Sequence, residues 1–382
     1  MPHQLRSMRW RIASAYVLLI AGTLLLLGAA VSAHFSGRFM QRYGRRLGLG
    51  LGFVVGAGGM LLSGAGVLFS SFALFLLGVT VVGAARGAAD QSRYAAADTQ
   101  PPERRGWAIS MIVFASTVGA AAGPWLASSR GNLLGGLTSV PQSGTMWAGA
   151  LLFALAGVLV FTLLRPDPQE LGRAFDEPPE AGQPLVAGRS LGAVLRLPAA
   201  QLALAAIVIG QATMVLVMSV TSLHMDHSHH GGDAISLVFM AHTIGMFGLS
   251  IVTGRVIDRI GRRSAILSGV ALLVSGSLIA PVSLQTQWLA LALFLVGLGW
   301  NLCYVGGSTL LSDILAPGER GGIQGSIELI VNVISASCNL LSGVIFGAFG
   351  YTTLGLLGAA LALVPLLVLG AQRLRIPRPA AA

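Results

Sequence analysis

The sequence contains no lysine, so all 24 of its basic residues are arginines. A nucleotide-binding loop of the Gly-x-x-x-x-Gly-Lys type therefore cannot form, which argues against a pump driven by ATP. The two cysteines, Cys303 and Cys338, both lie inside apolar stretches, and we expect no disulfide framework. The polar segments hold no grouping of nucleophile, base and acid, so we expect neither an enzyme nor a cofactor.

Charged residues are also scarce. They make up 10% of the chain, against 54% hydrophobic residues, and the mean hydropathy is +0.77. These values exclude an ordinary soluble domain. The apolar residues form runs of about twenty, the length of helix that crosses roughly 30 Å of hydrocarbon. The sequence thus predicts an all-α polytopic protein embedded in a lipid bilayer. The eleven expected spans are residues 12–34, 48–68, 72–92, 106–128, 145–165, 199–222, 235–254, 264–282, 287–311, 322–347 and 351–371.

Two copies of one charged motif interrupt the apolar runs. Residues 254–263 read Gly-Arg-Val-Ile-Asp-Arg-Ile-Gly-Arg-Arg, and residues 37–46 read Gly-Arg-Phe-Met-Gln-Arg-Tyr-Gly-Arg-Arg. Both glycines and all four arginines recur in register at an offset of 217 residues, since 254 − 37 gives 217. The change that matters chemically is Gln41 in place of Asp258. A repeat of this kind predicts two structurally similar halves.

The repeat suggests a division of the chain into three parts. We expect an N-terminal bundle of five spans at 1–165, a cytoplasmic linker at 166–198 and a C-terminal bundle of six spans at 199–382. With the motif loops in the cytoplasm, 19 of the 24 arginines fall in cytoplasmic loops or in the C-terminal tail. This distribution favours an inner or plasma membrane and a cytoplasmic C-terminus. It also accounts for the basic balance without nucleic acid as a partner.

The two motif copies, the two halves and the linker resemble the major facilitator superfamily. Residues 254–263 match the loop signature of that family fully, and residues 37–46 match it except at Gln41. Gly119, Gly123 and Pro124 resemble the family's antiporter motif. The resemblance implies a monomeric secondary transporter with two six-helix bundles around a cavity that opens alternately to each side. On this alignment the first half is one helix short, the family's first.

We interpret the repeated motif as a cytoplasmic gate. An acid at the end of a helix can cap the N-terminus of a neighbouring helix or pair with an arginine, in one conformational state and not in the other. Because Gln41 lacks a charge, we expect the stronger latch in the second half. The alternative is a basic loop that only sets the topology. The expected gate residues are Gly37, Gln41, Arg42, Gly44, Gly254, Asp258, Arg259, Gly261, Arg262 and Arg263.

Ionisable groups inside spans are the candidates for contact with protons or substrate, because lipid makes them costly. Arg86 and Asp90 lie four residues apart and share a helix face, either as a structural pair or as a contact to a solute. His242 lies near mid-membrane, where it could carry a coupling proton or, as a neutral imidazole, bond a facing helix.

Polar residues also form two stripes on neighbouring spans. One holds Glu328, Asn332, Ser335, Asn339 and Ser342, and the other holds Asn301, Tyr304, Ser308 and Ser312. A seam between helices would explain one such stripe, whereas two adjacent stripes with an acid favour a cavity wall. We therefore expect Glu328, Asn332, Asn339, Asn301 and Tyr304 to contact protons or solute.

Two further groups of residues allow more than one interpretation. Gly119 and Gly123 could simply form a close helix contact, with a kink at Pro124. The histidines between His224 and His230 are of types that bind metals but have no defined spacing, and we expect no metal site.

The sequence as a whole favours a secondary transporter of a small organic solute, coupled to protons and working as an exporter. The alternative is a truncated, non-transporting membrane protein or receptor of the same fold.

Overall fold

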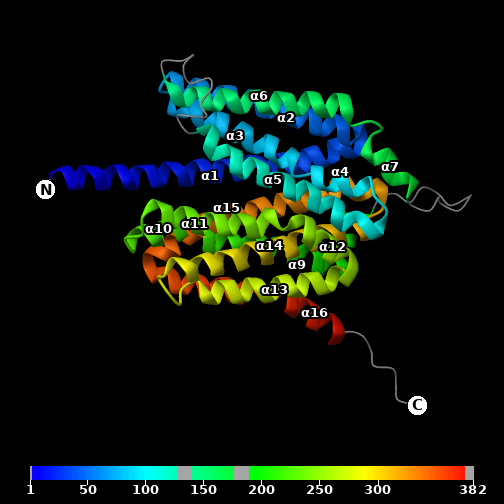
Figure 1. Ribbon diagram of the computed structural model, residues 1–382. Coiled ribbons are helices and arrows are strands. Elements are labelled where there is room, and N and C mark those ends of the chain that lie inside the picture. Colours follow the sequence, from blue (N-terminus) through cyan, green and yellow to red (C-terminus); the bar gives the residue numbers. More distant parts are fainter. Residues whose placement is uncertain (1, 128–139, 176–188, 375–382) are drawn as a thin grey trace, which may run out of the picture.

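The structure is a computed structural model that describes residues 2–127, 140–175 and 189–374, and every regular element in these ranges is helical. Figure 1 shows two bundles, one above the other, with α5 and α15 between them. The helices of the first bundle are α1 (Pro2–Tyr43), α2 (Arg45–Leu68), α3 (Phe72–Ala89), α4 (Ser92–Asp98), α5 (Arg105–Ala127) and α6 (Pro141–Leu163), with the short turn η1 (Pro102–Arg104) before α5.

The second bundle follows a segment that contains two short helices, α7 (Pro168–Ala174) and α8 (Leu191–Val194). Its helices are α9 (Pro198–Met218), α10 (Thr221–His227), α11 (Gly232–Thr243), the π-helical turn η3 (Ile244–Gly248), α12 (Ser250–Ile260), α13 (Arg262–Ile279), α14 (Thr286–Ile314), α15 (Pro317–Ala362) and α16 (Val364–Leu374).

The helices have the length and hydropathy of membrane spans. Eight in the described part of the chain could cross a membrane, and the bent pair Gly232–Gly248 and Ser250–Ile260 raises the number to nine. One of the eight, Gly318–Gln372, covers two expected spans, because the chain turns at Gly350, where φ is 78°. Helix α5 coincides with the expected span 106–128. The predicted all-helical, multi-pass class is confirmed, and the number of crossings roughly fits.

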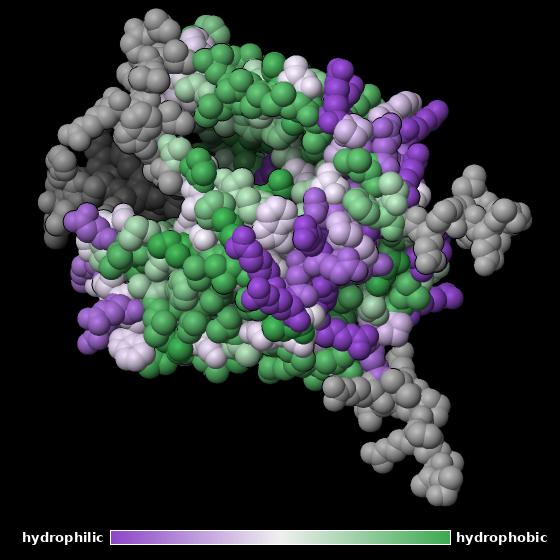
Figure 2. Space-filling model, turned by 45° about the vertical axis from the view of Figure 1, so that its right-hand side comes forward, coloured by the Kyte–Doolittle hydropathy of each residue, from purple (hydrophilic) through white to green (hydrophobic). Residues whose placement is uncertain are grey.

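The outer surface of the bundles is apolar. On α6, for example, Leu151, Leu155 and Val158 are 62%, 54% and 57% exposed. Figure 2 shows broad hydrophobic areas on the side that it draws, with most of the hydrophilic side chains gathered toward the right. A water-soluble monomer rarely exposes such large apolar areas, so the surface is suited to lipid.

The two copies of the motif have the same backbone. Each copy ends a helix at a glycine in an unusual conformation and begins the next helix directly after it. Gly44 has φ 95° and ψ 158°, and Gly261 has φ 88° and ψ 153°. This region of φ and ψ is accessible almost only to glycine. The recurrence of both glycines in the sequence is therefore explained by one tight turn made twice.

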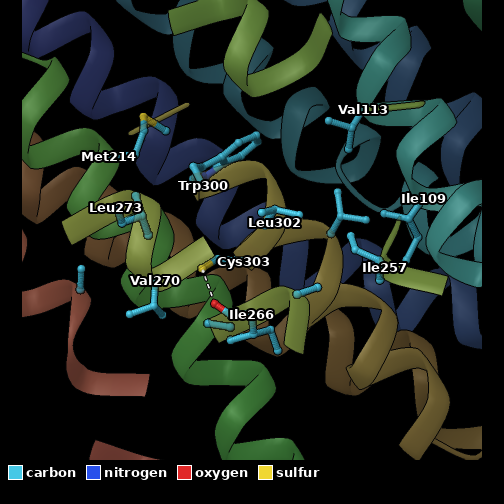
Figure 3. Packing of buried hydrophobic residues seen from close by; sticks show 14 of the residues in the cluster. Ile109, Val113, Met214, Ile257, Ile266, Val270, Leu273, Trp300, Leu302 and Cys303 are labelled. Carbon is cyan, nitrogen blue, oxygen red and sulfur yellow. Dashed lines mark hydrogen bonds between the residues drawn. The ribbon is translucent and has the colours of Figure 1, made fainter. Parts of the chain in front are cut away.

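A buried apolar cluster joins the bundles. Figure 3 shows Ile109 and Val113 of α5 beside Ile257 of α12 and Leu302 of α14. All four belong to one core cluster, and none is more than 7% exposed. Because burying a large aliphatic side chain contributes about 1.5–3 kcal/mol, this cluster stabilises the contact between α5 and the second bundle.

We predict that Gly261→Ala lowers stability by about 1–3 kcal/mol, because alanine is strained at this φ and ψ. Gly44→Ala should cost more, since a Cβ there would also overlap the carboxylate of Asp167. Apparent melting temperatures in detergent provide the measurement. The control is Gly343→Ala in α15, where a Cβ meets nothing within 4 Å and should cause no loss. Equal melting temperatures for wild type and Gly261→Ala would refute the strain at this turn.

Candidate functional site

Asp258 connects the two bundles. It lies near the end of α12, and its carboxylate accepts hydrogen bonds from the backbone N–H groups of Gly106 (3.1 Å) and Trp107 (2.8 Å) in the first turn of α5. Free N–H groups at the start of a helix carry partial positive charge, so a carboxylate is stabilised there. The helix-capping contact that the sequence predicted for Asp258 is therefore present, and it crosses from the second bundle to the first.

Gln41 makes the matching contact from the first bundle. Its Oε1 accepts a hydrogen bond from the backbone N–H of Gly322 (2.8 Å), and its Nε2 donates to the carbonyl of Gly318. Gly318 lies in the first turn of α15 and Gly322 in the second. Gln41 therefore occupies the same kind of position as Asp258, although it makes neutral hydrogen bonds where Asp258 makes charged ones.

The first glycine of each motif copy permits these close crossings. A Cβ at Gly37 would overlap the carbonyl of Gly321 on α15, and a Cβ at Gly254 would overlap the side chain of Ser110 on α5. The absence of a side chain lets α1 lie against α15 and α12 against α5. Both pairs of helices cross between the bundles.

Two ion-pair clusters surround the crossings. Asp98 lies 3.1 Å from Arg45 Nε and 3.4 Å from Arg320 Nη1. Asp313 lies 3.0 Å from Arg262 Nε and 3.2 Å from Arg105 Nη1. Each acid thus pairs with one arginine of its own bundle and one of the other.

Sequence reasoning did not find Asp98, Asp313 and their cross-bundle arginines. A signal was nevertheless present. Asp98 precedes Arg105 by seven residues, and Asp313 precedes Arg320 by the same seven. The internal repeat therefore extends beyond the ten-residue motif.

The polar segment after α6 is tied to the same end of the molecule. Asp167 accepts hydrogen bonds from the backbone N–H groups of Arg45 (3.1 Å) and Arg46 (2.9 Å) at the start of α2. Arg189 forms an ion pair with Glu319 at the start of α15. The hydrogen bond to Glu319 raises the pKa of Arg189. The segment thus holds both bundles at this end.

The remaining motif arginines have different surroundings. Arg262 also lies 3.4 Å from Asp258 in an i,i+4 pair. Arg42 lies against the ring of Tyr43. Arg259 and Arg263 are exposed and form no hydrogen bond or ion pair with the described residues. Among the described contacts of the predicted gate arginines, only Arg262 bonds the other bundle, because its Nη2 donates to the carbonyl of Pro102 just before α5.

A cavity of about 470 Å³ lies between the bundles. The surface in Figure 2 is hollowed between the two bundles. Five predicted residues line the cavity, namely Arg86, Asp90, Tyr304, Glu328 and Asn332. Arg93, Gln211 and Trp300 line it as well, and Figure 3 shows Trp300 between Met214 and the α5 residue Val113.

Glu328 forms an ion pair with Arg93 beside the cavity, and both side chains are 2% exposed. Arg93 belongs to α4 of the first bundle and Glu328 to α15 of the second. Arg93 Nε donates to Ser308 Oγ (3.1 Å), and its guanidinium lies 4.2 Å from the centre of the Tyr304 ring. Tyr94 donates to Glu328 at 3.3 Å. The charges are thus sealed from water by partners on three helices.

Arg86 and Asp90 form a second, looser pair. Arg86 Nε lies 3.8 Å from Asp90 Oδ2, and the side chains are 51% and 27% exposed. Neither side chain forms a hydrogen bond with the described residues. This pair is therefore open to the cavity, whereas the pair of Arg93 and Glu328 is closed.

Three predicted candidates lie elsewhere. His242 is 1% exposed, bonds the Leu293 carbonyl of α14 at 2.8 Å and does not line the cavity. Asn301 donates to the Met246 carbonyl and to Ser250 Oγ, both at 2.7 Å. Asn339 is not among the cavity residues either. The expected cavity positions of Asn301 and Asn339 are therefore not found, whereas His242 bonds a facing helix, which is one of the two alternatives expected for it. Asn301 instead ties α14 to η3 and α12 within the second bundle, where the backbone of η3 is π-helical.

The packing contact that is one of the two interpretations of Gly119 and Gly123 is not found among the described residues. In the part of the chain that the structure describes, a Cβ at either position would meet nothing within 4 Å, so no described helix approaches them closely. The side-chain environment of Pro124 lies outside the described residues.

Comparisons with known proteins agree with the fold. The sequence model of the Major Facilitator Superfamily matches residues 11–231 and 202–381. An uncharacterized MFS-type transporter of Bacillus subtilis, YdeG, is 33% identical over 358 residues, which cover 90% of this chain and 81% of that protein. The riboflavin transporter RfnT of Brucella anthropi is 30% identical over 348 residues, which cover 90% and 84%.

Two solved structures have a similar fold. The human organic anion transporter MFSD10 has a TM-score of 0.74 at 19% identity, covering 92% of this chain and 83% of that one. The fucose:proton symporter FucP of E. coli has a TM-score of 0.65 at 13% identity, covering 96% and 92%. At these identities the likeness concerns the fold alone.

We predict that Asp258→Ala loosens the contact between α12 and α5. Ser312 is 1% exposed beside Asp313, so Ser312→Cys in a variant without Cys303 and Cys338 reports opening through its reaction with a water-soluble maleimide. Hydrogen bonds to a charged group contribute about 1.5–3 kcal/mol, so the labelling rate should rise about tenfold or more. The exposed Arg259→Ala is the control. An unchanged rate in Asp258→Ala would refute the gate.

We predict a smaller effect for Gln41→Ala in the same assay. Neutral hydrogen bonds contribute about 0.5–1.5 kcal/mol each, and Gln41 makes only neutral ones to α15. The labelling rate of Ser312→Cys should therefore rise less than in Asp258→Ala. If Gln41→Ala raised the labelling rate as much as Asp258→Ala does, the charge of Asp258 would not make the contact of the second motif copy the stronger one.

Proposed function

The chain belongs to the major facilitator superfamily, and on that premise we propose that this membrane solute transporter carries a small organic molecule by alternating access, driven by protons. The observation that supports this proposal best is the pairing of Arg93 with Glu328 across the bundles, beside the cavity and next to the gate contacts. It links the charge state of one buried acid to the separation of the two halves.

The gate contacts support alternating access, because they hold the two bundles together at one end of the molecule. Asp258, Gln41 and the clusters at Asp98 and Asp313 all join one bundle to the other at the same end of the molecule. If the bundles rock apart at that end, these contacts break together. The cavity can then open to the side that they close in this structure.

The same movement would separate Arg93 from Glu328. A buried carboxylate that loses its arginine is left with an uncompensated charge, which is very costly in a site of low dielectric. Binding a proton removes this charge. Protonation of Glu328 and opening of the gate therefore favour each other, and this mutual dependence is what coupling to protons requires.

For the direction of transport we propose export in exchange for protons. The support is the resemblance of Gly119, Gly123 and Pro124 to the family's antiporter motif. For the solute, the relative named as a riboflavin transporter makes riboflavin the first molecule to test. The fucose symporter of similar fold suggests L-fucose as a contrasting neutral solute.

The transport assay uses purified protein in proteoliposomes with an imposed pH gradient. Riboflavin, riboflavin 5′-phosphate, L-fucose and a panel of amphipathic drugs are the solutes. We expect at least one of them to move in the direction opposite to the flow of protons. The rate of this movement should fall when the pH gradient is collapsed. Folded protein without pH-dependent flux of any solute would overturn the proposal, and movement in the same direction as protons would overturn export alone.

We predict that Glu328→Gln removes the dependence of flux on the pH gradient while leaving solute exchange at equal pH. The neutral amide mimics the protonated acid, so it should also raise labelling of Ser312→Cys. This second measurement keeps the prediction testable if flux is lost altogether. The matched control is His242→Gln, which lies outside the cavity and should retain the pH dependence. Wild-type pH dependence in Glu328→Gln would show that this acid is not the coupling site.

A further inference from the structure

The charges that line the cavity balance. Among the described residues that line it, the ionisable side chains with a formal charge are Arg86, Asp90, Arg93 and Glu328. Two are cationic and two are anionic, so the wall carries no net formal charge. Each cation has its anion close by, since Arg86 pairs with Asp90 and Arg93 with Glu328.

Of the two pairs, only that of Arg86 and Asp90 is available to a ligand. The pair of Arg93 and Glu328 is 2% exposed on both sides, and its polar atoms are used by Ser308 and Tyr94. Arg86 Nε and Asp90 Oδ2 are 3.8 Å apart, and the two side chains are 51% and 27% exposed and form no hydrogen bond with the described residues. The arginine can donate and the carboxylate can accept. Together they complement a polar edge that offers both an acceptor and a donor.

Much of the remaining wall is apolar. Ile112 of α5, Met214 of α9, Met246 and Phe247 of η3 and Trp300 of α14 line the cavity. The Trp300 ring is held in place, because its Nε1 donates to Gln211 Oε1 at 2.6 Å and the Phe247 ring meets it edge-on at 5.9 Å. An aromatic or thioether wall of this kind favours an apolar or aromatic body.

We infer that the solute is a net-neutral organic molecule with an aromatic or apolar body, whose polar edge binds Arg86 and Asp90 together. The inference rests on the proposed function, because it assigns the solute of the same cavity. A solute with a net charge would bring an uncompensated charge against a wall whose charges are already paired, at a cost in free energy. A small sugar would leave the aromatic wall without a partner.

Two flavins provide matched probes. Riboflavin is neutral and has an imide edge with one donor between two acceptors, and riboflavin 5′-phosphate has the same ring with an added anionic group. Binding of both to purified protein is measured by flavin fluorescence anisotropy. We expect riboflavin to bind at least tenfold more tightly than its phosphate, and L-fucose not to compete at a similar concentration. Equal or tighter binding of the phosphate by the wild type would overturn the inference.

Charge changes in the wall sharpen the test. Asp90→Asn leaves Arg86 unpaired and makes the wall cationic, so the preference for riboflavin over its phosphate should fall about tenfold or reverse. Arg86→Gln has the opposite effect and should increase that preference. The control is Asp233→Asn, an exposed acid at the start of α11 that does not line the cavity. A preference that is the same in all three variants would overturn the role of the pair.

A second set of probes covers the case in which flavins do not fit. Phenylalanine is a zwitterion, phenylalanine amide is a cation and N-acetylphenylalanine is an anion, and their binding is read from the shift in melting temperature. Binding of only the charged probes would overturn the inference, as would failure of every probe in both sets. The proposed function is judged separately, because pH-dependent flux of L-fucose or riboflavin 5′-phosphate would leave it standing. Flux of L-fucose would refute the aromatic or apolar body of the solute, and flux of riboflavin 5′-phosphate would refute its net-neutral charge.

Discussion

The closed end of this molecule depends on hydrogen bonds that cross between the bundles near the starts of α5 and α15. Each helix receives a side chain from the opposite bundle. Asp258 caps the first N–H groups of α5, and Gln41 bonds the N–H of Gly322 and the carbonyl of Gly318 on α15. The glycines of the motif allow the necessary approach, and the tight turns at Gly44 and Gly261 begin the following helices at the same place. One short sequence therefore supplies the contact, the room for it and the start of the next helix.

The ion pair beside the cavity and the contacts at the closed end of the molecule lie on the same helices. Arg93 and Asp98 lie on α4, with Arg105 at the start of α5, while Glu328 and Arg320 lie on α15. Arg93 pairs with Glu328 beside the cavity, and Asp98 pairs with Arg320 nearer the gate. Because α4 and α15 carry partners in both places, a movement that separates one pair also separates the other. The coupling we propose therefore requires only α4 and α15 to connect the cavity to the gate.

Sequence reasoning succeeded where a motif fixed the position of a residue within a helix. Asp258 could be predicted to cap a neighbouring helix or to pair with an arginine, because its position within a repeated motif fixed it at the end of a helix. Asp98 and Arg320 escaped notice because they are 222 residues apart and neither is unusual alone. The polar stripes failed for a different reason. Helical periodicity shows that Asn301 and Tyr304 share a face, but it cannot show that Asn301 meets Met246 and Ser250 while Tyr304 borders the cavity.

A gate with so many contacts must still open, and the physics of ion pairs explains how it can. Two conformations interconvert usefully only if they differ by a few kcal/mol. Buried ion pairs contribute little net stability, because desolvation offsets most of their Coulomb attraction. The clusters around Asp98 and Asp313 can therefore fix which groups meet in the closed state without holding it irreversibly. The neutral Gln41 lowers the cost of opening further, since its hydrogen bonds are weaker than those of a carboxylate. The difference between the two motif copies thus works in favour of a gate that is specific in its contacts and still reversible.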